Sequence, residues 1–374
     1  MNTAMLRRFG LSLAAPVVAA VVAILISSIV LEVSGSNALE TFKTMIENGT
    51  KLESMIDMLN RATPLYLSAV AAAIGFKMNL FNIGVEGQYI LAAFIAAVVG
   101  AQLDLWAPLH IAAIMLTAMI VGAAWSGLAG LLKVTRGVNE VISTIMLNFI
   151  AVGGLVAGLL PRFLDDPRAT NQGTTPIAES GRLPNLNSWV EVFTRDITKG
   201  RQLTGVLVVA IIVGVVYHVL LNRSRIGYDI RASGMNPTAA RVGGVPPKKM
   251  VMLAMVGGGL VAGLVGMPEI LSDTHAYDQG FIQGLGFAGI AVALLGRNSA
   301  PGMALAALLF GFLDSSAAIL QVSRLASSQI VVIMQATILL VAVIAYEVVN
   351  RVRQRDEVRR AAQLMGTVPV EAAT

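Results

Sequence analysis

The sequence predicts an all-α integral membrane protein of about ten transmembrane helices, and three observations support this fold class. The 374 residues are 56% hydrophobic and only 13% charged, whereas a typical soluble domain is about 25% charged, and the mean hydropathy is +0.74. Apolar runs of spanning length, about 20 residues, recur along the chain. Lys and Arg collect in the short loops on one side of these runs, as the positive-inside rule expects. We therefore predict a single transmembrane domain over residues 1–374.

The first half of the chain, residues 11–160, contains five predicted spans. Its first apolar run, residues 11–31, follows Arg7 and Arg8 and is too long for the core of a signal peptide, which predicts an uncleaved helix with a cytoplasmic N-terminus. Residues 34–61 place apolar side chains at helical spacing, typical of one or two short amphipathic helices on the outer face. The other four spans are predicted at residues 64–81 (opened by Pro64), 88–101, 109–132 and 138–160.

The second half, residues 203–349, also contains five predicted spans, and a long polar segment separates it from the first. That segment, residues 161–202, is rich in Pro, Gly and Asn and is predicted to be an irregular outer loop. The tail, residues 350–374, is rich in Arg and is predicted to be cytoplasmic. The spans are predicted at residues 203–221, 251–267, 281–295, 303–320 and 330–349.

The largest inside loop, residues 222–250, carries six Arg and Lys residues and a signal for a short helix. Pro237 suits the first position of a helix, and Asn236 before it suits the N-cap. One interpretation is that a partner protein pushes on this helix. The alternative is a basic loop that serves only to orient the chain in the membrane.

A polar junction, residues 81–88, interrupts the apolar sequence of the first half and reads Phe-Asn-Ile-Gly-Val-Glu-Gly-Gln. Unwound backbone in a membrane is tolerated only where protein buries it or where it lines a watery cavity. A second glycine-rich junction, residues 268–289, occupies the corresponding place in the second half. Because the first span runs outward and the sixth inward, the halves should be inverted repeats with paired broken helices, a pattern of transporters.

The polar residues at and near these junctions are candidates for a substrate path. The candidates are Asn82, Glu86, Gln88, Asn139, Glu140, Asn148, Gln283 and Phe287. Each has a structural alternative: Glu86 could brace a broken helix, Asn148 could join two helices, and Asn139 with Glu140 could cap the fifth span.

Other signals exclude several classes of function. Residues 284–289 match Gly-x-Gly-x-x-Gly, but no strand precedes them, and the chain has no Gly-x-x-x-x-Gly-Lys-Ser/Thr phosphate loop. The chain has no Cys, and its three His residues are not clustered, so neither a metal site nor a cofactor is expected. No paired catalytic groups are found, and the net charge of +5 reflects membrane topology rather than nucleic-acid binding.

Four ordered motifs resemble the membrane permease subunits of bacterial ABC importers, in the branch that takes branched-chain amino acids, simple sugars and nucleosides. They are the junction over residues 81–88, GVNEVISTIMLNFIA (137–151), IRASGMNPTAARVGG (230–244) and GLGFAGIAVALLG (284–296). The resemblance covers roughly residues 64–346, and the first two motifs look most like nucleoside permeases.

This resemblance implies a permease dimer in the bacterial inner membrane, usually of two different homologous subunits. It further implies an ATPase with two tandem nucleotide-binding halves, which would bind the ATP, and a solute-binding lipoprotein or periplasmic protein; membrane lipid would surround the spans. The family's cytoplasmic coupling helix would map onto residues 231–243. Its candidate contacts with the ATPase are Arg231, Gly234, Asn236, Ala239, Ala240 and Gly243.

Non-catalytic translocation of nucleosides is therefore the leading hypothesis, with Phe287 stacking on the base and the amides and Glu86 meeting polar groups. A sugar or another small polar substrate is the alternative within the family. An ion-coupled secondary transporter, with Glu86 and Glu140 as proton sites, is the rival outside it; ATP-dependent uptake separates the two. An intramembrane enzyme is disfavoured.

Overall fold

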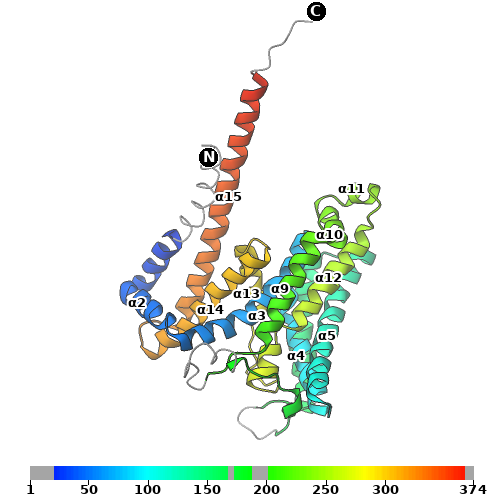
Figure 1. The fold of residues 1–374 in the computed structure, drawn as a ribbon, viewed down its shortest axis with the longest axis vertical. Helices are drawn as coiled ribbons and strands as arrows, with labels where there is room; N and C mark the ends of the chain where they lie inside the picture. Colours follow the sequence, from blue (N-terminus) through cyan, green and yellow to red (C-terminus); the bar gives the residue numbers. More distant parts are fainter. Residues whose placement is uncertain (1–20, 167–171, 188–200, 367–374) are drawn as a thin grey trace, which may run out of the picture. The chain divides into compact units, whose positions relative to one another are not determined.

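The computed structural model describes residues 21–166, 172–187 and 201–366. The predictions for residues 1–20 and 367–374, and for residues 167–171 and 188–200 of the outer loop, lie outside it. The described residues are predominantly α-helical (Figure 1), which confirms the all-α class. They divide into two compact units, residues 46–316 and residues 1–45 with 317–374.

Among the described residues, six helices are long and apolar enough to cross a membrane, or seven if the bent pair of Val21–Val33 and α2 (Ala38–Gly49), which meet at 117°, counts as one span. The six are α4 (Val85–Gln102), α5 (Ala107–Arg136), the run Glu140–Arg162, α9 (Val206–Arg223), α14 (Ala300–Val322), and Ser328–Ala345 of α15 (Ser328–Gly366). Three further helices of the larger unit are α3 (Leu52–Lys77), α12 (Pro247–Gly263) and α13 (Leu285–Leu295). The chain therefore contains several membrane-spanning helices; the count of ten in inverted repeats stays a prediction.

Helix α3 is central to the larger unit, and its middle is buried. Leu67, Ala69, Val70 and their neighbours to Ala73 are each 0% exposed. Because most of these side chains are small, adjoining helices approach the α3 backbone closely.

Helices α5 and α12 lie side by side (Figure 1) and pack backbone against backbone. A Cβ on Gly259 of α12 would lie 2.6 Å from the Cβ of Ser126 and 2.9 Å from the Cα of Ala123. Ser126 also donates to the carbonyl of Met255 at 2.7 Å. Only glycine fits at this position without displacing one of the helices.

Three predicted boundaries were wrong. Pro64 lies inside α3 rather than opening it, because a buried helix tolerates a proline where neighbouring groups satisfy the freed carbonyl. The predicted amphipathic segment accordingly divides between α2 and the first turns of α3. The predicted eighth span begins as a helix only at Leu285, and α15 continues through residue 366 instead of ending near residue 349.

The described part of the predicted outer loop is fastened to the turn between α12 and α13. The amide of Thr174 donates to the carbonyl of Tyr277 at 2.8 Å, and that of Ile177 donates to the carbonyl of His275 at 2.8 Å. The side-chain amides of Gln279 and Gln172 also bond at 2.8 Å. These pairs join segments about a hundred residues apart in the sequence.

Candidate functional site

The first junction is an irregular segment between α3 and α4, and a pair of buried amides stabilises it. Gln88 donates to Oδ1 of Asn82 at 3.0 Å, and the same oxygen accepts the amide of Gly84 at 3.0 Å. Both side chains are 1% exposed. The candidates Asn82 and Gln88 therefore stabilise the irregular backbone between α3 and α4.

Asn148, on α6 (Glu140–Phe149), holds the same junction from outside. Its Nδ2 donates to the carbonyl of Ile83 at 2.9 Å, and its Oδ1 accepts the amide of Gly87 at 2.9 Å. One side chain thus satisfies a carbonyl before α4 and an amide in its first turn, which otherwise lack helical partners.

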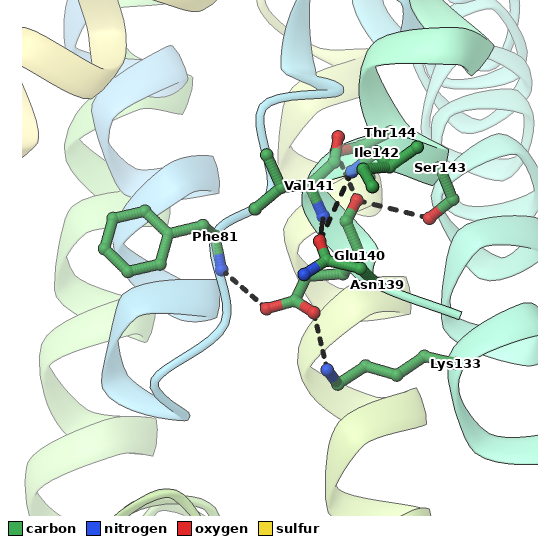
Figure 2. A network of polar contacts seen from close by, with 8 residues as sticks. All are labelled: Phe81, Lys133, Asn139, Glu140, Val141, Ile142, Ser143 and Thr144. Carbon is green, nitrogen blue, oxygen red and sulfur yellow. Dashed lines mark hydrogen bonds and ion pairs between the residues drawn. The ribbon is translucent and has the colours of Figure 1, made fainter. Parts of the chain in front are cut away.

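Glu140 and Asn139 lie at the start of α6 (Figure 2). One carboxylate oxygen of Glu140 lies 2.5 Å from Nζ of Lys133, and the other accepts the amide of Phe81 at 3.5 Å. Asn139 is exposed and caps α6 by accepting the amides of Val141 at 2.8 Å and Ile142 at 3.4 Å. The cap and the ion pair both anchor the helix that carries Asn148.

Glu86 belongs to the first turn of α4, but its carboxylate reaches the second junction. Its Oε1 accepts the amide of Gly284 at 2.6 Å, and its Oε2 accepts that of Gly286 at 2.8 Å. The side chain is buried, with 7% exposed. Gly284, with φ of +91°, is the N-cap residue of α13, so Glu86 caps a helix of the other half.

The structure divides the candidates of the substrate path by exposure. Asn82, Glu86, Gln88, Glu140 and Asn148 are buried and hydrogen-bonded within the protein. Gln283 and Phe287 are exposed, Phe287 by 55%, on either side of the glycines that Glu86 contacts. Only these two, with the exposed cap Asn139, present side chains at the surface.

Two residues at the second junction were missed in the sequence. Tyr89, 0% exposed, places its hydroxyl 2.8 Å from the carbonyl of Ile282 and 3.1 Å from Glu86. Ser68 of α3 donates to the carbonyl of Leu285 at 2.8 Å. A hydroxyl within an apolar run is the signal that could have identified them, since such groups join helices in membranes.

The predicted coupling loop contains two helices, α10 (Arg225–Met235) and α11 (Pro237–Val242). The predicted short helix and its N-cap are confirmed, since Asn236 accepts the amides of Thr238 at 3.1 Å and Ala239 at 3.0 Å. Helix α10 was not predicted; Ser224 caps it by accepting the amide of Gly227 at 3.1 Å.

The candidate contacts with an ATPase lie on different faces of this helix pair. Asn236, Ala239 and Gly243 are exposed, whereas Ala240 is buried. Gly234 lies against the end of α3, where an added Cβ would come 2.6 Å from the carbonyl carbon of Met78. Arg231 is partly buried. The apolar side chains of Met235 and Val242 are 81% and 87% exposed.

Within the part of the chain that the structure describes, no group of three or more His, Asp or Glu residues could hold a metal ion. The junctions instead consist of amides, carboxylates and hydroxyls bonded to backbone. Such an arrangement can hold two broken helices together, with exposed side chains beside them.

The sequence was compared with known proteins. Residues 54–344 match the family described as the branched-chain amino acid transport system permease component. The chain belongs to this permease family. Its members are components of transporters, and the permease is a multi-pass membrane protein of this kind.

Several relatives of the permease carry substrate names. The guanosine ABC transporter permease protein NupP of Bacillus subtilis is 32% identical over 336 residues, 89% of this chain and 93% of the relative. The nucleoside ABC transporter permease protein NupB of Lactococcus lactis is 30% identical, covering 81% and 83% of the two chains. The glucose ABC transporter permease protein TsgB13 of Haloferax volcanii is 29% identical, covering 87% and 85%. No solved structure matches the permease.

Proposed function

We propose that this permease is the non-catalytic membrane subunit of an ATP-driven importer that translocates nucleosides. The observation that carries the proposal is the similarity to a guanosine permease over 89% of this chain and 93% of the relative. The nucleoside permease of Lactococcus lactis supports the same substrate class.

In this proposal the permease lies in a bacterial inner membrane as two inverted five-span halves with both termini in the cytoplasm. The two broken helices support it: α4 and α13 each begin at a polar junction, and Glu86 joins the two. Paired broken helices of inverted repeats are where transporters bind substrate.

Substrate recognition is assigned to the exposed side of these junctions. Phe287 offers a ring face for a nucleobase, and Gln283 offers a donor and an acceptor for its polar edge or for the ribose. The buried candidates Asn82, Gln88 and Asn148 support the path by fixing the backbone of the first break. Asn139 and Glu140 fix the start of α6 beside it.

In this proposal a separate subunit binds the ATP, because this chain has no phosphate loop of its own. The family resemblance implies that this ATPase has two tandem nucleotide-binding halves. We propose that this ATPase docks on α10 and α11, where Met235 and Val242 expose apolar side chains beside a capped helix. Exposed apolar side chains of this kind become buried in the core of an interface when a partner docks.

Two further partners complete the importer: a second homologous permease subunit and a solute-binding lipoprotein or periplasmic protein. The solute-binding protein would dock on the outer loop together with the α12–α13 turn, since these segments are hydrogen-bonded into one surface. Cysteines at Gln172 and Asp273 should cross-link to it, and a transporting complex that cross-links at neither position would contradict this docking.

Uptake by vesicles that contain all partner subunits tests the function. Labelled guanosine should accumulate only when ATP is present on the side of the membrane where the ATPase lies. An excess of unlabelled glucose should not reduce this uptake. Uptake driven by a proton gradient without ATP would favour the ion-coupled transporter, and competition by glucose would favour the sugar permease that the relative in Haloferax volcanii suggests. Phe287→Ala should reduce uptake at least tenfold, about the effect of losing one base–aromatic stack.

A further inference from the structure

The second junction, residues 282–286, is held almost entirely by side chains of the first half. The carbonyls of Ile282 and Leu285 lie 2.8 Å from the hydroxyls of Tyr89 and Ser68, respectively. Both carboxylate oxygens of Glu86 accept amides of the same segment, those of Gly284 and Gly286. Four backbone groups within five residues thus bond to three side chains, which we call the clamp: Ser68, Glu86 and Tyr89.

Close packing keeps the clamped segment from shifting. A Cβ added to Gly286 would lie 2.8 Å from the Cα of Glu86, and one added to Gly289 would lie 2.7 Å from the carbonyl carbon of Ser68. The first turn of α13 therefore touches the backbones of α4 and α3. At such distances a displacement of a few tenths of an ångström breaks contacts on one side or the other.

The charge of Glu86 suits its place between two helix ends. It belongs to the first turn of α4 and bonds to the first turn of α13, and both ends carry the partial positive charge of a helix N-terminus. A carboxylate accepts two amides without offering a competing donor, whereas a carboxamide has one oxygen and one donor group. Glutamine therefore cannot replace both bonds.

The two breaks differ in what holds them. Side chains of the first half itself, Asn82, Gln88 and Asn148, satisfy the first break. The second break depends on the clamp, which lies about 200 residues earlier in the chain. A relative movement of the two halves therefore changes the second break before the first.

We propose that Ser68, Glu86 and Tyr89 are positioning residues that hold Gln283 and Phe287 in place for substrate, without contacting it themselves. The proposal rests on the assignment of those two exposed side chains to the substrate path. Gln283 lies within the clamped residues 282–286, and Phe287 follows them directly. The orientation of both side chains therefore depends on the four backbone bonds. Loss of a clamp bond should disorder the segment and slow transport.

Two matched controls separate positioning from general stability. Ser126→Ala removes a buried hydroxyl that donates to the carbonyl of Met255 at 2.7 Å, as Ser68→Ala does at Leu285. Tyr217→Phe removes a hydroxyl that donates to the carbonyl of Asn298 at 2.7 Å, as Tyr89→Phe does at Ile282. Each pair loses the same kind of hydrogen bond, from a side-chain hydroxyl to a backbone carbonyl, at different places; Tyr89→Phe additionally loses the 3.1 Å contact with Glu86.

The first measurement does not depend on transport. The chain has no native Cys, so Ile282→Cys, at a side chain that is 45% exposed, gives the permease a single thiol, beside the clamp, whose labelling is followed on this subunit of the full complex. Ser68→Ala and Tyr89→Phe should each raise its rate of maleimide labelling about fivefold, the factor expected for one lost net hydrogen bond. Glu86→Gln should raise it further, and the two controls should leave it unchanged.

The second measurement is guanosine uptake without the added cysteine. Ser68→Ala and Tyr89→Phe should slow it about fivefold, while Ser126→Ala and Tyr217→Phe, with equal losses of Tm, leave it within twofold. Unchanged labelling in the clamp variants would show that Ser68, Glu86 and Tyr89 do not hold residues 282–286 in place. Increased labelling with native uptake would overturn its role in positioning. If the native complex transports no nucleoside, the proposed function fails, yet the labelling result still decides whether the clamp exists.

Discussion

Glu140 and Lys133 form an ion pair whose two members differ in burial. The side chain of Lys133 is 29% exposed, whereas that of Glu140 is 11% exposed. The lysine ammonium can turn toward water if its partner is lost. The carboxylate of Glu140 cannot turn toward water. Without Lys133 its remaining side-chain contact would be the one with the amide of Phe81 at 3.5 Å.

Lys133→Met should therefore destabilise the permease by about 1–3 kcal/mol, because it leaves a buried carboxylate without its counter-ion. Glu140→Gln should cost less, since its amide oxygen still accepts the Phe81 amide. Thermal unfolding in detergent measures both. The double variant should recover part of the loss, and equal losses in the two single variants would contradict this account.

Glu269 begins the turn between α12 and α13. Burial, with smaller contributions from Asp273 and Asp278, raises the pKa of its carboxyl to about 7. Below about pH 4.5 the carboxyl is protonated in the folded and unfolded states alike. As the pH rises from about 4.5 to about 7, the carboxyl loses its proton in the unfolded state but keeps it in the folded state. Ionisation therefore favours the unfolded state, and the free energy of unfolding falls over this range.

Glu269→Gln should remove that loss. We expect equal Tm values for the native and variant chains near pH 4.5 and a more stable variant at pH 8. The difference should be about 1 kcal/mol, because partial exposure screens the effect. The comparison cancels other titrating groups, among them His275, whose pKa burial and Arg182 lower. A difference in Tm that does not change with pH would disprove this assignment.

At the scale of elements, α10 is fitted against the end of α3 at Gly234. Gly234→Ala should displace α10, because the new Cβ would lie 2.6 Å from the carbonyl carbon of Met78. We expect substrate-stimulated ATP hydrolysis to fall about tenfold, the effect of an unfavourable shift of about 1.4 kcal/mol.

Gly127→Ala, on α5 and outside the two helices of the coupling loop, is the matched control for that variant. Its added Cβ would meet only Cγ2 of Val256, at 3.5 Å. It should leave ATP hydrolysis within twofold. Native coupling in Gly234→Ala would show that the position of α10 does not matter to the ATPase.

Helices α5 and α12 give a second prediction at this scale. Gly259→Ala should destabilise the permease by about 1–3 kcal/mol, because its Cβ would overlap Ser126 and the α5 backbone. Gly257→Ala, two residues away, would meet only Cγ2 of Ile74 at 3.9 Å. It should be neutral or stabilising by up to about 1 kcal/mol. Equal Tm shifts in the two variants would rule out backbone packing as the cause.

Local signals predicted elements well, and distant contacts account for the errors. The cap at Asn236 and the helix after Pro237 depend on residues within one turn, which the sequence displays directly. Pro64 misled the prediction because it lies buried inside α3, and burial depends on helices from elsewhere in the chain. The late start of α13 likewise depends on Glu86, which holds Gly284 in a conformation outside the helix.

At the scale of the whole chain, the outer loop and the α12–α13 turn behave as one surface. Gln172→Cys with Gln279→Cys should form a disulfide under oxidising conditions, because the two side chains are in contact and a backbone bond at 3.1 Å joins the residues. Uptake should persist in the oxidised variant, since the disulfide joins two residues that are already in contact. A reducible loss of uptake would show that the loop and turn separate during transport. Gel mobility with and without reductant reports the bond.

The polar composition of the junctions was enough to identify them, but not to assign their partners. Asn82, Glu86, Gln88 and Asn148 were singled out because polar groups are costly in a membrane. The first three lie at the first break, and Asn148 of α6 bonds to it. That Glu86 reaches Gly284, and that Tyr89 and Ser68 hold the same segment, follows only from the folded chain. The family was recognisable from four short motifs. The exposure of the individual polar side chains could not be predicted from them.

The contact between α5 and α12 also bears on how the permease is made. A ribosome adds about 5–20 residues per second, and roughly 140 residues separate Gly122 from Gly259. The glycine-lined face of α5 thus enters the bilayer some 7–30 s before its partner is synthesised. During that interval lipid or the insertion machinery must occupy the face, and α12 must displace it. Substitutions there would then lower the yield of inserted protein during biogenesis, even when the finished permease still transports.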